Sequence, residues 1–213
     1  MNRISDWEAI NRATYNNIAN EYHNKTKDLD MKWQIAMFTE QLPKSGTILD
    51  FMSGGSRDVK KFHELGFKVS ATDYEQGFLD IIARDVPAAK TYQGDARTVN
   101  TGEQYDGVWC STGIFMFPRQ EAFQVIENIA KHVKPDGSLY INFKVQNMLD
   151  PVEERVYEDK KYDGAKRYES FFSLFEMNGL LSPFFDIRRE MVAYNQNPAY
   201  RTHPIMDLFC VKK

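Results

Sequence analysis

Apolar and polar positions along the chain follow two different periods. Through residues 1–43, apolar and aromatic side chains such as Trp7 and Ile10, and then Tyr15, Ile18 and Tyr22, recur at three- and four-residue spacing, which predicts helices. From residue 47 onward, short apolar runs alternate with segments of helical spacing. Strands that alternate with helices are typical of an α/β fold built on a mostly parallel sheet.

The individual elements can be placed from this pattern and from the residues that interrupt it. We expect strands at 48–50, in a short run ending at Asp73, and around 91–92, 107–111, 186–194 and 206–211. We expect helices at about 74–84, 120–132 and 170–178. Gly179 follows the last of these, as glycine often follows a helix C-terminus. A long loop, 195–204, separates the final two strands.

Residues 47–73 carry most of the information about chemistry. A first strand ends in Asp50, a turn of small residues follows at 53–56, and a helix leads through Gly66 to a second strand ending in Asp73. In doubly wound α/β folds the ligand lies at the carboxyl ends of the strands, and an acid about 20 residues after the glycine turn binds ribose hydroxyls. The segment therefore predicts a nucleotide-containing ligand, with Asp73 on its ribose.

The turn after the first strand distinguishes between two classes of cofactor. A dinucleotide site needs G-x-G-x-x-G and a pyrophosphate at the helix N-terminus. Here only Gly54 and Gly55 are present, and Asp50 in front of them would repel a phosphate. A carboxylate at this place suits a cofactor with an ammonium or sulfonium group. The pattern therefore disfavours an NAD-linked oxidoreductase.

Several segments resemble one family in the same order along the chain. The acid and turn at 50–56 resemble the D-x-G-x-G-x-G motif of class I S-adenosylmethionine-dependent methyltransferases. Residues 92–96, 105–112 and 133–140 resemble later segments of that family, and 206–213 resemble the last strand of its small, tellurite-resistance-like members. The resemblance covers nearly the whole chain. It implies a doubly wound, Rossmann-like seven-stranded sheet, mostly parallel, with an antiparallel last strand.

The resemblance also implies a cofactor, S-adenosylmethionine, and residues that bind it. The expected cofactor-binding residues are Tyr22 on an N-terminal lid, Asp50, Ser53, Gly54 and Gly55 at the amino-acid end, Asp73 at the ribose, Tyr74, Asp95 and Ala96 at the adenine, and Cys110 at the methyl-transfer site. Other roles remain open for two of them. Tyr22, like Tyr15, could instead pack in an amphipathic helix, and Asp95 could cap the turn after its strand.

The first motif departs from the family pattern at two positions. Met52 and Ser56 stand where the family usually has its first and third glycines. Met52 needs either a backbone conformation open to a residue with a Cβ atom or a shifted loop, and Ser56 is a mild change if its φ stays negative. An altered loop also suggests an alternative, a noncatalytic methyltransferase-like partner subunit. The retained acids Asp50, Asp73 and Asp95 argue against that alternative.

The acceptor side is defined less clearly. The loop after the fourth strand contains Phe115, Met116 and Phe117. These side chains either line an apolar acceptor pocket or pack in the core. Many family members have a histidine at the place of Met116, so no catalytic base is assigned. His63 and His132 are expected to be structural, whereas His23 and His203 could reach the mouth of the site. Methyl transfer to a neutral amine or a thiolate needs no strong base if the acceptor is held in line.

Residues 147–170 are polar, irregular and rich in charges of both signs. They form either a solvated insertion or a substrate lid, in which Tyr168 is a candidate acceptor contact. The expected organisation is one structural domain, with an N-terminal helical lid at 1–43 and a methyltransferase domain at 44–213. The expected reaction is in-line methyl transfer to a small-molecule or short-peptide acceptor.

The composition of the chain limits which partners and which cellular location we expect. The chain has 213 residues, 42% of them hydrophobic, and a net charge of −3, which gives no electrostatic reason to expect nucleic acid. Its two cysteines, Cys110 and Cys210, lie apart from each other and from any Cys/His cluster, so we expect neither a disulfide framework nor a metal site. No apolar run approaches a membrane span or a secretory leader. We therefore expect a cytoplasmic protein.

Overall fold

A computed structural model describes residues 5–146, 151–193 and 204–213. Its main sheet has seven strands in the order β3-β2-β1-β4-β5-β9-β8. They are β1 (Thr47–Phe51), β2 (Lys68–Asp73), β3 (Lys90–Gln93), β4 (Tyr105–Cys110), β5 (Val133–Lys144), β8 (Phe185–Ala193) and β9 (Ile205–Lys212). The strands β1 to β5 pair in parallel, while β9 pairs antiparallel with both β5 and β8. The predicted α/β fold, with an antiparallel last strand, is confirmed.

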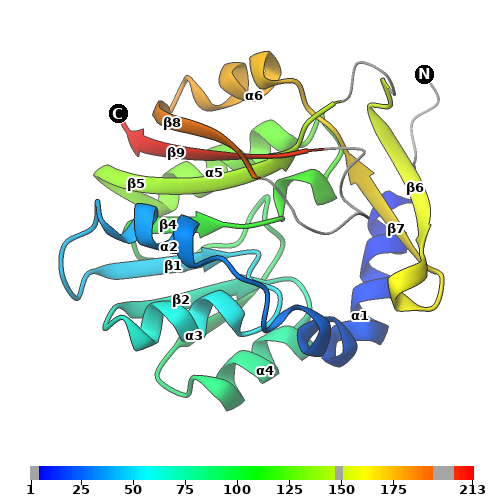
Figure 1. Cartoon of the computed structure of the whole chain (residues 1–213), viewed down its shortest axis with the longest axis horizontal. Helices are drawn as coiled ribbons and strands as arrows, with labels where there is room; N and C mark the ends of the chain where they lie inside the picture. Colours follow the sequence, from blue (N-terminus) through cyan, green and yellow to red (C-terminus); the bar gives the residue numbers. More distant parts are fainter. Residues whose placement is uncertain (1–4, 147–150, 194–203) are drawn as a thin grey trace.

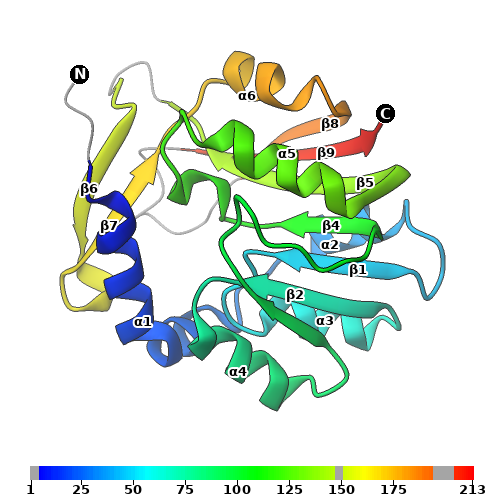
Figure 2. The same ribbon diagram turned by 180° about the vertical axis from the view of Figure 1, so that it is seen from behind.

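Helices cover both faces of this sheet (Figures 1 and 2). In Figure 1, α2 (Lys32–Thr39) and α3 (Arg57–Glu64) lie in front of the sheet, and in Figure 2, α5 (Ala122–His132) lies in front of the opposite face. The helix α4 (Gln76–Asp85) packs beside β2 and β3. Because both faces are covered, the central strands are buried almost throughout, as in β1, where only Thr47 is partly exposed.

The layer beneath α2 and α3 is built from stacked rings. Trp109 of β4 and Tyr140 of β5 stack with their ring centroids 3.8 Å apart, and Phe38 of α2 packs on Trp109 at 5.3 Å. Phe38 is 1% exposed, so α2 packs on the face of the sheet as part of its core. Of the two helices formed by the segment expected to be a lid, only α1 (Trp7–Thr26) lies across the carboxyl ends of the strands (Figure 1).

The segment predicted to be irregular at 147–170 is a β-hairpin over most of its length, and that prediction was wrong. The strands β6 (Glu154–Asp159) and β7 (Ala165–Ser170) pair antiparallel, joined through the short 3₁₀ turn η2 (Lys160–Tyr162). The mixed charges that suggested a solvated loop bind one another, as Arg167 does with Asp159 at 2.8 Å. Residues 147–150, also in that segment, lie outside the described residues.

The hairpin and α1 are joined by hydrogen bonds. The Asn11 side chain accepts from the Tyr168 backbone N–H at 2.8 Å and donates to the Tyr168 carbonyl at 3.4 Å, so it pairs with β7 much as a neighbouring strand would. The Thr14 hydroxyl donates to the Lys166 carbonyl at 2.5 Å. Both elements lie at the same end of the sheet (Figure 1), so they form a single cap over the strand ends.

The helix α6 (Leu174–Leu181) differs from the prediction at both ends. Ser173 and Glu176 form a reciprocal capping box, which sets the beginning of the helix four residues later than expected. Gly179 lies within the helix, and Ser182 caps its end. Among the described residues, no helix combines the length and apolar character needed to cross a membrane.

Candidate active site

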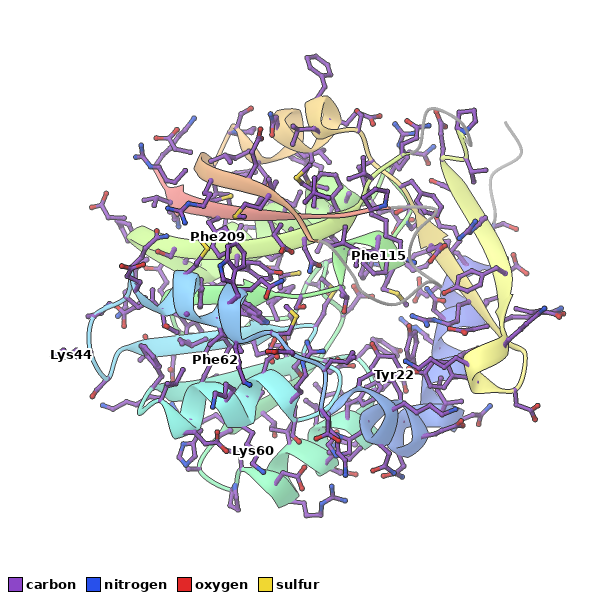
Figure 3. All side chains as sticks on the ribbon, in the orientation of Figure 1. Tyr22, Lys44, Lys60, Phe62, Phe115 and Phe209 are labelled. Atoms are coloured by element: carbon purple, nitrogen blue, oxygen red, sulfur yellow. The ribbon has the colours of Figure 1, made fainter. Side chains whose placement is uncertain are left out.

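A cavity lies at the carboxyl ends of β1 to β4, beneath α1. It encloses about 1120 Å³ of space, its open mouth included. Its walls are residues 52–55 after β1, 73–75 after β2, 94–97 after β3 and 111–113 after β4, together with one side of α1. Figure 3 shows Tyr22 and Phe115 at this end of the molecule and Lys44 at the opposite end.

The loop after β1 keeps a tight turn despite its missing glycines. Met52 has a φ of +58°, the same left-handed value as Gly54. This conformation costs a residue with a Cβ atom about 1–2 kcal/mol. Ser56 has a φ of −79°, a negative value at which serine in place of glycine causes no backbone strain. The Met52 side chain packs against Gly113 of the neighbouring loop, where an added Cβ would lie only 2.6 Å from Met52 Cε.

Asp73 joins the loops after β1 and β2. Its Oδ2 accepts from the Gly54 N–H at 2.8 Å, and its Oδ1 accepts from the Glu75 N–H at 3.0 Å. Burial raises the pKa of Asp73 to about 6, although these backbone donors lower it. The carboxylate therefore faces the cavity with two oxygens that still have lone pairs for hydroxyl donors.

Asp50 lies behind the cavity wall. It is 2% exposed, and its Oδ2 has no hydrogen-bond partner among the described residues. Burial and the neighbouring Asp58 raise the pKa of Asp50 well above its ordinary value, while Arg57 lowers it. A buried carboxylate oxygen without a donor is uncommon and favours a cationic or hydrogen-bonding ligand nearby.

Arg57 and Asp58 supply charge beside Asp50, and both line the cavity. The guanidinium binds Asp58 through two nitrogens, each at 2.7 Å, and Trp109 Nε1 donates to Asp58 Oδ2 at 3.0 Å. Asp58 thereby holds Arg57 at the start of α3. The remaining donors of Arg57 are available for a ligand carboxylate.

The wall after β3 carries an ion-pair network. Both oxygens of Asp95 accept from Arg97, and one of these contacts measures 2.8 Å, from Nε to Oδ1. Burial opposes the ionisation of Asp95, but Arg97 outweighs it and holds the pKa of Asp95 below its ordinary value. Arg12 of α1 lies 3.5 Å from the centroid of the Tyr74 ring, and its Nη2 lies 3.6 Å from Asp95 Oδ2. A guanidinium thus covers the two side chains expected to bind adenine.

The other end of the cavity is lined by uncharged residues: Trp7, Asn11, Tyr15, Ser111, Thr112, Gly113, Met116 and Phe117. We call these residues the acceptor end. Trp7 packs on Phe117 with 5.4 Å between ring centroids. Tyr15 accepts a hydrogen bond from Arg167 of β7 and lies 3.6 Å from Met116 Sδ.

The structure brings most of the predicted site residues to this cavity. Those that line it are Tyr22, Ser53, Gly54, Gly55, Asp73, Tyr74, Asp95, Ala96, Met116 and Phe117. Four others lie outside its lining: Asp50, Cys110, Phe115 and Tyr168. Cys110 is fully buried, and burial raises the pKa of its thiol. Its side chain points into the core because residues alternate along a strand, so Ser111 lines the cavity in its place.

Sequence reasoning missed the residues that α1, the start of α3 and the loops after β3 and β4 contribute. They include Trp7, Glu8, Asn11, Arg12, Arg57, Asp58, Arg97, Ser111 and Thr112. One signal was available, since Glu8, Arg12 and Tyr15 recur at helical spacing and so share a face of α1. Of the histidines, His23 is buried against Gly55 and His132 is buried in α5, while His203 lies outside the described residues.

Comparison with known proteins identifies the chemistry of this arrangement. Residues 48–137 match the family model of a methyltransferase domain. The matched segment runs from β1 into β5 and contains the four loops that line the cavity. Over this segment, which is somewhat less than half of the chain, the protein is similar to a methyltransferase domain.

Two proteins of known structure share the fold of this chain over nearly its whole length. The 1,6-didemethyltoxoflavin N1-methyltransferase of Burkholderia thailandensis, solved with its substrate and S-adenosylhomocysteine, is 16% identical, with a TM-score of 0.75 over 100% of this chain and 92% of that one. A TehB-like methyltransferase of Corynebacterium glutamicum is 16% identical, with a TM-score of 0.68 over 95% of this chain and 100% of that one.

One sequence relative is similar over a shorter region. The dTDP-4-amino-2,3,4,6-tetradeoxy-D-glucose N,N-dimethyltransferase of Saccharopolyspora spinosa is 26% identical over 105 residues. The match covers 48% of this chain and 42% of that relative, so less than half of the relative's length has a counterpart here.

Proposed function

We propose that the protein transfers a methyl group from S-adenosylmethionine to a nitrogen atom of a small-molecule acceptor. The observation that supports it is a cavity with two chemically different ends. One end combines Asp73, the backbone of Gly54 and Gly55, and the charged pair Arg57–Asp58. The residues of the acceptor end are themselves uncharged, and the Arg97 guanidinium lies 5.5 Å from the centroid of the Trp7 ring and 5.7 Å from that of the Phe117 ring. A polar cofactor and an apolar or neutral acceptor would meet where the two ends join.

The residues around the first end fit the parts of the cofactor. Asp73 would accept from the ribose hydroxyls, and Gly54 and Gly55 would let the backbone approach the amino-acid part closely. Arg57 would bind its carboxylate, while Asp58 and the unpaired oxygen of Asp50 favour its ammonium group. Tyr74 and Ala96 would contact the adenine, which requires the Arg12 side chain to move off the Tyr74 ring.

At the acceptor end, the protein would act by placement and by exclusion of water. The bound cofactor supplies an electrophilic methyl group on a positively charged sulfur. Trp7, Met116 and Phe117 offer apolar walls, and the Tyr15 and Ser111 hydroxyls can orient a polar acceptor. Glu8, a carboxylate next to Trp7 in the cavity lining, is paired with Arg12 and Arg97 and so is poorly placed to remove a proton. This end therefore suits a nucleophile that attacks as a neutral amine. Two of the similar proteins are N-methyltransferases by name, which supports a nitrogen acceptor.

Calorimetric titration tests the cofactor site directly. We expect micromolar binding of S-adenosylmethionine and S-adenosylhomocysteine and no binding of NAD, which is the control because the loop after β1 lacks a pyrophosphate site. Absence of binding to both sulfur compounds would overturn the proposed function. A panel of small primary and secondary amines, assayed with labelled cofactor, then tests the acceptor class. Transfer only to hydroxyl or thiol compounds would refute the nitrogen acceptor.

Cofactor affinity should fall in mild acid because of Asp73. Its pKa of about 6 means that the carboxylate is mostly ionised at pH 7, whereas roughly one in ten is ionised at pH 5. Ribose hydroxyls donate to the ionised form, so the Kd for S-adenosylhomocysteine should rise about tenfold between pH 7 and pH 5. Calorimetry over this range measures the change. The Asp73→Asn variant should show a flat profile, and a flat profile in the parent protein would contradict the assignment.

A further inference from the structure

Thr112 has an unusual backbone conformation at the acceptor end. It is the second residue after β4, lines the cavity and has a φ of +61°. A β-branched residue rarely takes this left-handed conformation, and such strain persists only where the surroundings enforce it. The contacts that hold Thr112 therefore indicate which residues shape this part of the site.

One buried side chain holds Thr112 from the sheet. The Thr112 N–H donates to Asn142 Oδ1 at 2.6 Å, and Asn142, in β5, is 3% exposed. The amide nitrogen of Asn142 donates to the Tyr140 hydroxyl at 3.0 Å and lies 3.4 Å from Asp207 Oδ1. These acceptors settle which way the amide faces, so Oδ1 must point toward Thr112.

The group behind Asn142 is itself held by hydrogen bonds. The Tyr140 hydroxyl donates to Asp207 Oδ1 at 2.6 Å, and Gln34 Nε2 of α2 donates to Asp207 Oδ2 at 3.2 Å. Asn142 and Asp207 are direct partners in the β5–β9 ladder. The antiparallel strand β9 therefore supplies the carboxylate that orients the asparagine.

The strained loop also presses against the loop after β1. Gly113 follows Thr112, and a Cβ built on it would lie within 2.6 to 3.1 Å of three atoms of the Met52 side chain. Met52 has its own left-handed φ of +58° and leads into the backbone of Ser53, Gly54 and Gly55. A shift of Thr112 and Gly113 would therefore push on the loop that contacts Asp73.

We infer that Asn142 is a positioning residue for the methyl-transfer site. It does not line the cavity. It acts by holding Thr112 in the left-handed conformation, which in turn keeps the loops after β4 and β1 in their relative positions. This inference rests on the proposed function, because the loops in question form the site where cofactor and acceptor would meet.

The test combines a deletion with a rescue. Asn142→Ala removes the acceptor of the Thr112 N–H and should weaken S-adenosylhomocysteine binding about three- to tenfold, the effect of one lost hydrogen bond. Adding Thr112→Gly to that variant should restore most of the affinity, because glycine adopts a positive φ without strain. Asn178→Ala on α6, away from the cavity, is the matched control and should bind like the parent protein.

A second readout does not need the ligand. Hydrogen exchange of the Thr112 amide, followed by NMR, should be slow in the parent protein and faster in Asn142→Ala. Unchanged affinity together with unchanged exchange in that variant would overturn the inference, as would a double variant that stays as weak as Asn142→Ala. If the parent protein binds no cofactor, the proposed function fails, and the exchange of the Thr112 amide still decides whether Asn142 holds the loop.

Discussion

Replacing Glu169 with alanine should lower the free energy of unfolding by about 3–5 kcal/mol, the usual effect of removing one partner from a buried ion pair. Glu169 is 1% exposed and binds both Lys144 and Arg155. Burial lowers the pKa of Lys144, and the Glu169 carboxylate opposes this. Alanine would leave the Lys144 ammonium buried over the Phe115 ring, 4.9 Å from its centroid, without a carboxylate. Denaturation with urea measures the change.

Two variants make this prediction specific to the buried charge. Glu158→Ala, at an exposed position on the same hairpin, should change the free energy of unfolding by no more than about 0.5 kcal/mol. The double variant Lys144→Met with Glu169→Leu should recover most of the lost stability, because apolar side chains of similar size often replace a buried pair without loss. A Glu169→Ala protein as stable as its parent would mean that Lys144 reaches water without its partner.

Asp73→Ala should raise the Kd for S-adenosylmethionine about ten- to a hundredfold, since hydrogen bonds to a charged acceptor contribute about 1.5–3 kcal/mol. The substitution removes the proposed ribose acceptor. It also removes the partner of the Gly54 N–H, which lies 2.8 Å from Asp73 Oδ2. Both losses act on the same ligand, so calorimetry should show a fall in affinity with no change in stoichiometry.

The matched control for this substitution is Asp80→Ala on α4, whose exposed carboxylate binds only Gln76 at 2.7 Å among the contacts described. It should bind the cofactor like the parent protein. Circular dichroism checks that both variants are folded. A folded Asp73→Ala protein with unchanged affinity would remove Asp73 from the proposed site.

The part of the fold that places the cofactor loops was predictable from local pattern. The runs that became β1, β2 and β4 are buried over most of their length because both faces of the sheet are covered, and the turn at Gly66 has a φ of +89° that glycine adopts readily. Parallel strands bring their carboxyl ends to one edge, so Gly54, Asp73 and Asp95 meet although they are far apart in sequence.

The hairpin β6–β7 was not predictable from the same signals. Its strands carry charged residues that usually mark a solvated loop, and only the folded chain pairs them, as in Glu169 with Lys144 and Arg167 with Asp159. Local charge density cannot show whether an opposite charge from another strand will lie within reach. The same limit applies to Arg12, which meets Tyr74 and Asp95 only because α1 folds across the strand ends.

By itself, the sequence determined the order of strands and helices outside the hairpin β6–β7, the acids at or near the ends of β1, β2 and β3, and the family whose motif they resemble. These features depend on hydrophobic period and on short spacings within one strand-turn-helix unit. Only the tertiary structure decided that Ser111 rather than Cys110 lines the cavity, that Arg12 lies over Tyr74 and beside Asp95, and that Asn142 accepts a hydrogen bond from Thr112 in its left-handed conformation. Each of these contacts depends on the direction of a side chain and on a residue that is distant in the sequence but adjacent in the fold.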